Sequence, residues 1–584
     1  MLNYLNKIRL SFLPLLILGL IFSLPFSLKW RVLPQPSFFL EIISIVLVSS
    51  LVFCASFIKR HPEKLPKESI YLFLIALFFI IQAFLLRLPY FGYTLLVAIL
   101  FLSLIILFWA IESLLQYYSR QTVLNVIAIA LVIAVLWQCF VCWLQLFDKA
   151  SYFRDIVMTS QWKHYVFGQL AQRNHLGHFL FWGLIANIYL CNKNKYFFLP
   201  SLIVIISTLG IVASRTILLY IFVLFLLSLI YIIFRRETRK FSIFMLVVII
   251  AVFLSQIFIP IIIQQFIDFS VNSGVDRVAA EGFSSRLYEW KKAWLIFKDN
   301  PLLGVGWKNY AAASYKYDQY FSLSEFVSSG KLFLHSHNII LQLLAETGII
   351  GTLIITTTFL IMIKHLFRLP ENVESLSLIS MITVSLLHSM LEYPLWYIYF
   401  FYPFFILVKL SQDNVSNQSF QAGCKIRIFA IIFSICLFVV ASFQFFYYQN
   451  LITIYKQCNK NKIHTTQVLH QFANEHIFLS YFADKLSLQC VGTFLNQEQL
   501  KQFNWLKNSV EKTYNFRPFS AQNLQKSIIY YFSGNLKDSQ NYAKNTWLHY
   551  PKRLDKDIKI LRKRDDLKPL LDTALTIKND NSKQ

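Results

Sequence analysis

The sequence predicts an all-α polytopic membrane protein with about 12 to 13 transmembrane helices. Of its 584 residues, 56% are hydrophobic and only 15% are charged, against about 25% charged in a soluble domain. Apolar runs recur along the first three quarters of the chain, and most approach the roughly 20 residues that cross a bilayer as a helix. The same composition excludes a soluble multidomain protein, a disordered chain, collagen and a coiled coil.

Thirteen apolar segments are expected to be the spans. The first is too long for the apolar region of a signal peptide and precedes no small-residue cleavage site, so we expect it to be retained. Residues 376–391 and 395–410 are either two spans or one long helix interrupted at Pro394. In order, the segments are residues 10–28, 38–58, 69–86, 92–116, 122–147, 174–191, 197–213, 216–234, 241–263, 338–363, 376–391, 395–410 and 427–446.

In a soluble protein, the net charge of +25 would suggest nucleic-acid binding. In a membrane protein, loop Lys and Arg instead serve topology, anionic headgroups or a phosphorylated substrate. Loops on the side of the N-terminus hold 18 Lys and Arg and the opposite short loops hold 8, which predicts a cytoplasmic N-terminus. With thirteen crossings, the C-terminus lies outside. The outer eight are Lys29, Arg31, Arg87, Lys149, Arg154, Lys163, Arg173 and Arg215.

Four regions are expected: transmembrane helices 1–9 (1–263), a large outer loop (264–337), further transmembrane helices (338–446) and a soluble helical tail (447–584). The tail holds 21 Lys and Arg against 11 Asp and Glu. Two amphipathic runs in residues 521–550, broken at Ser533-Gly534-Asn535 and closed by Pro551, resemble one tetratricopeptide-type unit. A plain helical cap is the alternative.

Two pairs of cysteines call for different interpretations. Cys458 and Cys490 could form a disulfide if the tail faces an oxidising compartment. Cys139 and Cys142 form a C-x-x-C inside an apolar span, where helix packing is favoured over a redox or zinc site.

Two groups of polar residues begin spans on the outer side. Gln172, Arg173 and Asn174 enter the sixth span, where hydrogen-bond donors and the helix dipole suit an anionic group. Arg215 lies between two apolar helices, where its charge costs free energy unless the side chain is ion-paired or binds a ligand. An interfacial cap for the first group and snorkelling to headgroups for Arg215 are the alternatives.

The large loop contains a helical run with Arg286, Trp290 and Ala293 at helical spacing. The run ends at Asn300-Pro301-Leu302-Leu303-Gly304-Val305-Gly306. His335-Ser336-His337-Asn338 follows at the mouth of the tenth span, where a neutral imidazole can accept a proton from a hydroxyl. Two His separated by a single residue could also bind metal, but no carboxylate lies within four residues of them.

The last group is Leu391-Glu392-Tyr393-Pro394-Leu395-Trp396, between two predicted spans. Pro394 breaks the helix beside an acid and a phenol, and broken helices at membrane depth are tolerated where they line a cavity. A hairpin turn with an aromatic belt is the alternative.

Taken together and in this order, the motifs resemble the Wzy_C / O-antigen ligase superfamily of bacterial inner-membrane glycosyltransferases, over about residues 160–400. Within it, the Leu391-Glu392-Tyr393-Pro394-Leu395-Trp396 stretch and the basic soluble tail after the last span resemble the PglL-type protein O-oligosaccharyltransferases, which act on pilins. The motifs that carry the resemblance are Gln172-x-Asn174, Ser214-Arg215, Arg286 with Trp290 and Ala293, Asn300-Pro301-Leu302-x-Gly304-x-Gly306, His337-Asn338 and Glu346-x-Gly348.

The resemblance implies transfer of a preassembled glycan from an undecaprenyl-diphosphate carrier to an acceptor hydroxyl at the periplasmic face, without a nucleotide, cofactor or obligatory metal. His337 would be the general base, and Arg215, Arg286 and Arg173 would bind the diphosphate. Attack from the face opposite the diphosphate would invert the anomeric centre. Only Glu392 could be the carboxylate of a covalent route, which we disfavour. The supporting residues would be Gln172, Asn174, His335, Asn338, Glu392 and Tyr393.

The expected partners are the lipid-linked oligosaccharide, an acceptor protein such as a type IV pilin, and the bilayer of the bacterial inner membrane, with no nucleic acid. Two related activities are rivals. An O-antigen ligase passing glycan to lipid A core shares the loop and His but normally lacks the large tail. A Wzy-type O-antigen polymerase shares the topology but usually not the His337-Asn338 context. A transporter would show paired broken helices in both halves, which the sequence lacks.

Overall fold

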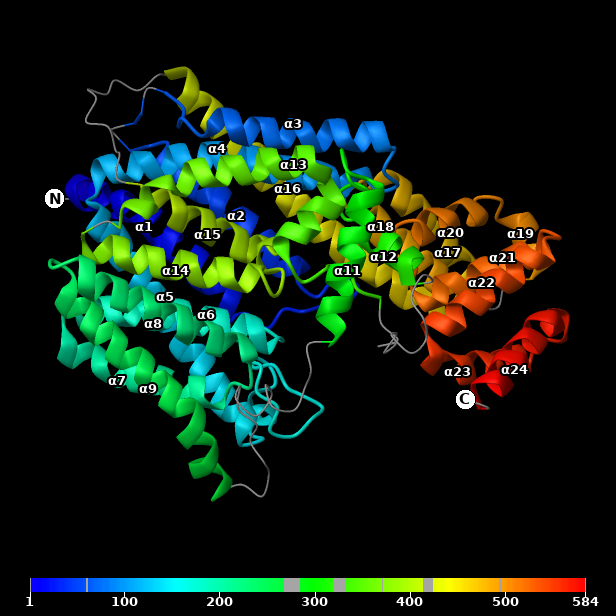
Figure 1. The fold of residues 1–584 in the computed structure, drawn as a ribbon. Coiled ribbons are helices and arrows are strands. Elements are labelled where there is room, and N and C mark those ends of the chain that lie inside the picture. Colours follow the sequence, from blue (N-terminus) through cyan, green and yellow to red (C-terminus); the bar gives the residue numbers. More distant parts are fainter. Residues whose placement is uncertain are drawn as a thin grey trace. The chain divides into compact units, whose positions relative to one another are not determined.

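The computed structural model describes residues 2–58, 61–62, 64–266, 284–318, 332–369, 371–412, 424–492 and 496–582. Over these ranges the chain forms helices and no strands, as Figure 1 shows. Eight helices in the described ranges are long and apolar enough to cross a membrane. The predicted fold class, an all-α protein with many membrane spans, is therefore confirmed.

Each of the thirteen predicted segments coincides with a helix. The pair around Pro394 forms two separate helices, α14 and α15, with the 3₁₀ turn η4 (Pro394–Trp396) between them. The thirteen are α1 (Leu2–Ser27), α2 (Phe38–Ala55), α3 (Ser69–Leu86), α4 (Phe91–Tyr117), α5 (Arg120–Leu146), α6 (Arg173–Cys191), α7 (Lys195–Ile211), α8 (Arg215–Phe234), α9 (Arg239–Gln264), α13 (Ile339–Ile363), α14 (Val373–Ser389), α15 (Ile398–Ser411) and α16 (Cys424–Lys456).

The chain divides into two compact units. Unit 1 comprises the described parts of residues 1–73, 101–282 and 356–443, and unit 2 those of residues 74–100, 283–355 and 444–584. Each unit therefore draws on three separate stretches of sequence, and several long helices contribute residues to both.

In unit 1, α6 is the central helix. Every residue from His175 to Cys191 is buried, and α6 packs against α5, α7, α8 and α14. A helix that is apolar on all sides belongs in the interior of a bundle. The polar residues at the start of α6 therefore stand at one end of a buried helix.

One residue in the orientation count lies elsewhere than expected. Lys409 is one of the 18 Lys and Arg that the sequence assigns to loops on the side of the N-terminus, but it lies inside α15 and is buried. Its Nζ is 2.6 Å from Glu112 Oε1 and 3.4 Å from Glu68 Oε2. A buried ammonium group needs such partners. When Lys409 is left out of the count, the ratio of inner to outer loop Lys and Arg still exceeds two to one.

In unit 2, the tail forms short helices after α16. The helix–turn–helix appears at the predicted residues: Gly534 has φ +81°, and Asn535 Oδ1 accepts from the backbone N–H of Asp538 at 3.2 Å, capping the second helix. Pro551 opens the next helix, a position that needs no backbone N–H. The tail helices are α17 (Lys462–Glu475), α18 (Ser480–Val491), α19 (Gln497–Gln502), α20 (Leu506–Tyr514), α21 (Ser520–Phe532), α22 (Leu536–His549), α23 (Pro551–Leu561) and α24 (Lys568–Ser582).

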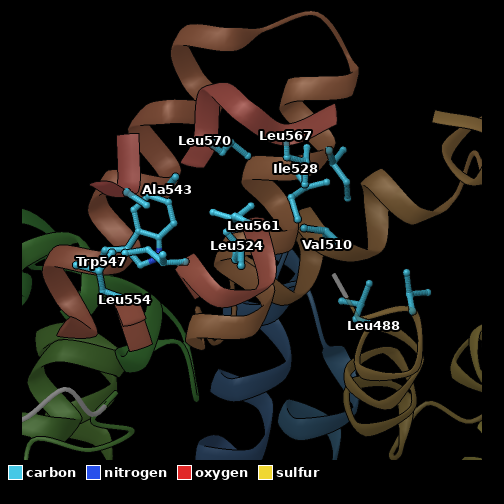
Figure 2. Packing of buried hydrophobic residues seen from close by; sticks show 14 of the residues in the cluster. Leu488, Val510, Leu524, Ile528, Ala543, Trp547, Leu554, Leu561, Leu567 and Leu570 are labelled. Carbon is cyan, nitrogen blue, oxygen red and sulfur yellow. The ribbon is translucent and has the colours of Figure 1, made fainter. Parts of the chain in front are cut away.

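The tail has its own hydrophobic core. Figure 2 shows apolar side chains from several tail helices directed into a common interior, among them Leu524, Ile528 and Leu561. Trp547 is fully buried in this cluster, and its indole N–H donates to Asp557 Oδ2 at 3.1 Å.

One further link lies within the tail, and a second joins the tail to the rest of unit 2. Cys458 and Cys490 are disulfide-bonded, with Cα atoms 5.7 Å apart. Tyr90, in the α3–α4 connection, donates its hydroxyl to Asp484 Oδ2 of α18 at 3.0 Å. The tail is thus a packed part of unit 2.

Candidate active site

A break in α13 organises the site in unit 2. At Gly348 the backbone leaves helical geometry, with φ 62° and ψ −168°. The Asn300–Gly306 stretch fills the break: Val305 N–H donates to Ala345 O and Gly306 N–H to Glu346 O, both at 2.9 Å. In return, Ile349 N–H donates to Pro301 O at 2.8 Å. Two sequence motifs that lie some 40 residues apart thus satisfy each other's backbone groups.

This interlock requires glycine at two positions. Gly304 and Gly348 both have positive φ, and a Cβ on either would collide with the backbone of the other segment. The conformation of Gly348 is one that essentially only glycine adopts. Gln82 of α3 closes the junction, donating through Nε2 to Leu303 O at 2.6 Å and to Glu346 O at 2.8 Å.

His337 lies two residues before the start of α13. Its backbone is left-handed, with φ +59°. Asn338 caps the helix, because its Oδ1 accepts from the N–H groups of Ile340 and Leu341 at 3.0 and 3.1 Å. Ser336 N–H donates to Gln342 Oε1 at 2.6 Å. Both residues that flank His337 are therefore held by the first turns of α13.

His335 is the more buried of the two histidines, with 6% of its surface exposed. Burial lowers the pKa of His335 well below its ordinary value, and the neighbouring Lys308, His337 and Arg517 side chains lower that pKa further. His335 is therefore neutral at neutral pH. His337 is only partly buried, and its ring lies 5.8 Å from that of Phe333.

Arg286 lies in the first turn of α11 (Ser284–Asp299). One face of α11 is buried through Glu289, Lys292, Ala293 and Ile296. The other face borders a cavity of about 500 Å³ with mostly apolar walls, which Leu341 of α13 also borders, one turn after His337. The residues that line the cavity are Leu287, Tyr288, Trp290, Lys291, Trp294 and Leu341.

In unit 1, three of the predicted motifs meet through hydrogen bonds. Asn174 Nδ2 donates to Glu392 Oε1 at 2.8 Å, and Ser214 Oγ donates to Asn174 Oδ1 at 2.8 Å. Ser214 is also the residue before α8, which Arg215 begins. The amide of Asn174, at the start of α6, thus forms a polar junction that bridges Ser214, which precedes α8, and Glu392, which follows α14.

The other predicted residues of unit 1 lie around this junction. Gln172 precedes α6 as its N-cap residue without a side-chain capping bond. The Arg173 guanidinium lies 3.8 Å from the centre of the Tyr165 ring, and its Nε donates to Val166 O at 3.3 Å. The Tyr393 ring lies 5.9 Å from that of Tyr397.

A layer of buried polar side chains next to this junction was not predicted. His175, His178 and His388 lie with ring centres 5.0 to 5.3 Å apart along the chain His175–His388–His178. Tyr220 Oη lies 2.7 Å from His388 Nδ1, and Ser385 Oγ lies 3.0 Å from His178 Nε2. The available signal was three histidines within apolar segments, a pattern that often marks functional residues in membranes.

Two parts of the chain match known protein families. Residues 200–356 match the Wzy_C family, described as "O-Antigen ligase". Residues 376–540 match the Wzy_C_2 family, described as "Virulence factor membrane-bound polymerase, C-terminal". The first match contains Arg215, Arg286 and His337, and the second contains Glu392. The resemblance predicted from the motifs is confirmed.

Among individual proteins, the chain is similar to two enzymes of Acinetobacter baylyi. It is 25% identical to the ComP-specific O-oligosaccharyltransferase, over 37% of this chain and 38% of that protein. It is 28% identical to the General O-oligosaccharyltransferase, over 44% of this chain and 45% of that protein. The matches thus span less than half the length of each relative.

Proposed function

We propose that the protein is a membrane-embedded glycosyltransferase that moves a preassembled glycan from an undecaprenyl-diphosphate carrier to a Ser or Thr hydroxyl of a periplasmic protein, such as a type IV pilin. The single observation that carries this proposal is the junction of unit 2. There, Asn300–Gly306 fills the break of α13 at Gly348, and both neighbours of His337 are hydrogen-bonded to the first turns of the same helix. The names of the two relatives support a protein acceptor.

In the proposed reaction, the acceptor oxygen attacks the anomeric carbon of the carrier-linked sugar. His337 accepts the hydroxyl proton as the new C–O bond forms. The bond between the anomeric carbon and the diphosphate oxygen breaks on the opposite face, and undecaprenyl diphosphate leaves. The anomeric centre is inverted.

The arginines would act on the departing diphosphate, because a guanidinium fork binds phosphate oxygens bidentately and offsets their growing charge. Arg286 has this role in unit 2, where it lies on the helix that borders the cavity. The mostly apolar cavity would take the part of the carrier next to the phosphates. Arg215 and Arg173 of unit 1 are assigned the same diphosphate-binding role because they lie in the Ser214-Arg215 and Gln172-x-Asn174 motifs.

We propose that the protein lies in the bacterial inner membrane with its active site facing the periplasm. The loop charge bias supports this orientation. The Cys458–Cys490 disulfide also supports it, because structural disulfides persist in oxidising compartments such as the periplasm and are rare in the cytosol.

A second candidate, O-antigen ligase activity towards lipid A core, is favoured by the description of the family that residues 200–356 match. Expression in a host that makes a known lipid-linked glycan, together with a candidate pilin, separates the two. Glycan on the pilin supports the primary proposal. Glycan on lipid A core supports the ligase, longer carrier-linked glycan supports a polymerase, and no transfer to any acceptor contradicts all three.

A further inference from the structure

A buried ionic cluster in unit 2 joins the large loop to the tail. The side chain of Asp318, which directly follows α12 (Tyr310–Tyr317), is 7% exposed and contacts Lys292 on one side and His549 on the other. Lys292 Nζ of α11 lies 2.8 Å from Asp318 Oδ1, and His549 Nδ1 of α22 lies 2.9 Å from Asp318 Oδ2. The side chains of Lys292 and His549 are themselves 3% and 8% exposed.

The same cluster fixes the first half of α11. Lys292 is ion-paired with Glu289, one turn earlier on α11. Glu289 Oε2 accepts from the Tyr310 hydroxyl at 2.9 Å and from Ser314 Oγ at 3.4 Å. Burial raises the pKa of Glu289, while the neighbouring Lys292 opposes that rise. Glu289 follows Arg286 by one helical turn, so the helix turn that carries Arg286 is tied to α12.

The tail in turn holds α12. Asn523 of α21 donates through Nδ2 to the Tyr315 hydroxyl at 3.0 Å. The His549 ring packs against the Tyr315 ring with centres 4.5 Å apart. Contacts therefore run from the tail hairpin α21–α22 through α12 to α11. Removing one member of a buried charge cluster leaves the others unmatched, so such a cluster strongly favours one arrangement of its helices.

We propose that His549 is a positioning residue. Through Asp318 and Lys292 it sets the orientation of α11, and this orientation determines how strongly Arg286 binds the donor diphosphate. The tail would then be part of the donor-binding machinery. This inference rests on the proposed function, because it assumes that Arg286 binds the carrier.

The test is the affinity of the purified full-length protein for undecaprenyl diphosphate, together with its rate of glycan transfer. We expect His549→Ala to weaken carrier binding about tenfold, since interaction energies within such networks are about 0.5–3 kcal/mol. His549→Asn keeps a hydrogen-bond donor for Asp318 and should restore most of the affinity. His470→Ala is the matched control: His470 is also a tail histidine near a carboxylate, 3.8 Å from Asp484, but it contacts α17, α18 and α20 rather than the loop.

A double-mutant cycle separates positioning from simple stability. If His549 acts through Arg286, then His549→Ala should weaken binding less than twofold in the Arg286→Ala background. If the two substitutions weaken carrier binding by independent factors that multiply in the double variant, the inference is overturned. A His549→Ala protein with a lower melting temperature but unchanged carrier affinity would also overturn it. A wild-type protein that binds the carrier but transfers glycan to no acceptor would contradict the proposed function and leave the cycle measurable. If Arg286→Ala alone leaves carrier affinity unchanged, both the diphosphate role and this inference are wrong.

Discussion

Asn174 and Glu392 are hydrogen-bonded at 2.8 Å although 218 residues separate them in sequence. Glu392 is only 5% exposed, and a carboxylate buried to that degree needs hydrogen-bond donors. The amide of Asn174 also accepts from Ser214, the residue before Arg215. The bond thus links two motifs that both resemble those of the same enzyme superfamily.

Asn174→Ala and Glu392→Gln should each lower glycan transfer, and the double variant should be little worse than the more damaging single variant. Residues of one network are non-additive, with coupling energies of about 0.5–3 kcal/mol. Initial rates of the four proteins give the coupling. Asn187→Ala serves as the control, because Asn187 is also buried on α6 but donates to Ser201. Strictly multiplicative losses would show that the bond does not matter for transfer.

Arg286→Lys and Arg215→Lys should each remain defective, because Lys keeps the charge but loses the bidentate fork. Hydrogen bonds to charged groups contribute about 1.5–3 kcal/mol, so we expect the donor kcat/KM to fall about 10- to 100-fold. Arg236→Lys, at an exposed position between α8 and α9, should behave as wild type. Wild-type kinetics and donor affinity in both variants would remove the arginines from the mechanism.

Gly348→Ala should destabilise the protein and reduce transfer. The conformation of Gly348 costs about 1–3 kcal/mol for any other residue, and the new methyl group would also press on the Leu302 carbonyl. Gly534→Ala is a matched control, since Gly534 has φ +81° but open space where an added Cβ would lie. Thermal unfolding and transfer rates compare the two variants. Equal losses of stability and activity would argue against a special role for the junction.

Replacing Cys458 and Cys490 by Ser should loosen the tail. The bridge closes a loop of 32 residues, for which the chain-entropy estimate is about 3–4 kcal/mol. Limited proteolysis and thermal unfolding of the tail should show the loss, and reductant should produce it in the wild type. Cys436→Ser, which removes an exposed free thiol on α16, should have no such effect. A reductant-insensitive tail would mean that the bridge adds nothing to its stability.

The apolar spans were predictable from sequence because crossing a bilayer demands length and composition that single segments display. The break at Gly348 was not predicted, because residues 338–363 form one continuous apolar run. Its partner segment, Asn300–Gly306, was recognised only as a motif. The Asn174–Glu392 bond and the Asp318–His549 pair depend on how distant helices pack, which no local pattern encodes. The histidines of α6 and α14 were overlooked because an isolated His in an apolar helix has many explanations.

The central claim, that His337 is the general base, is tested most directly by in vitro transfer from purified lipid-linked glycan. His337→Ala should lower the rate about 10²–10⁴-fold, the usual cost of losing a positioned base, while the protein still inserts and accumulates. His335→Ala should cost much less, and a chelator should have no effect on the wild type. Near-normal turnover by His337→Ala would contradict the general-base mechanism, and equal damage from both substitutions together with chelator sensitivity would indicate a metal site instead.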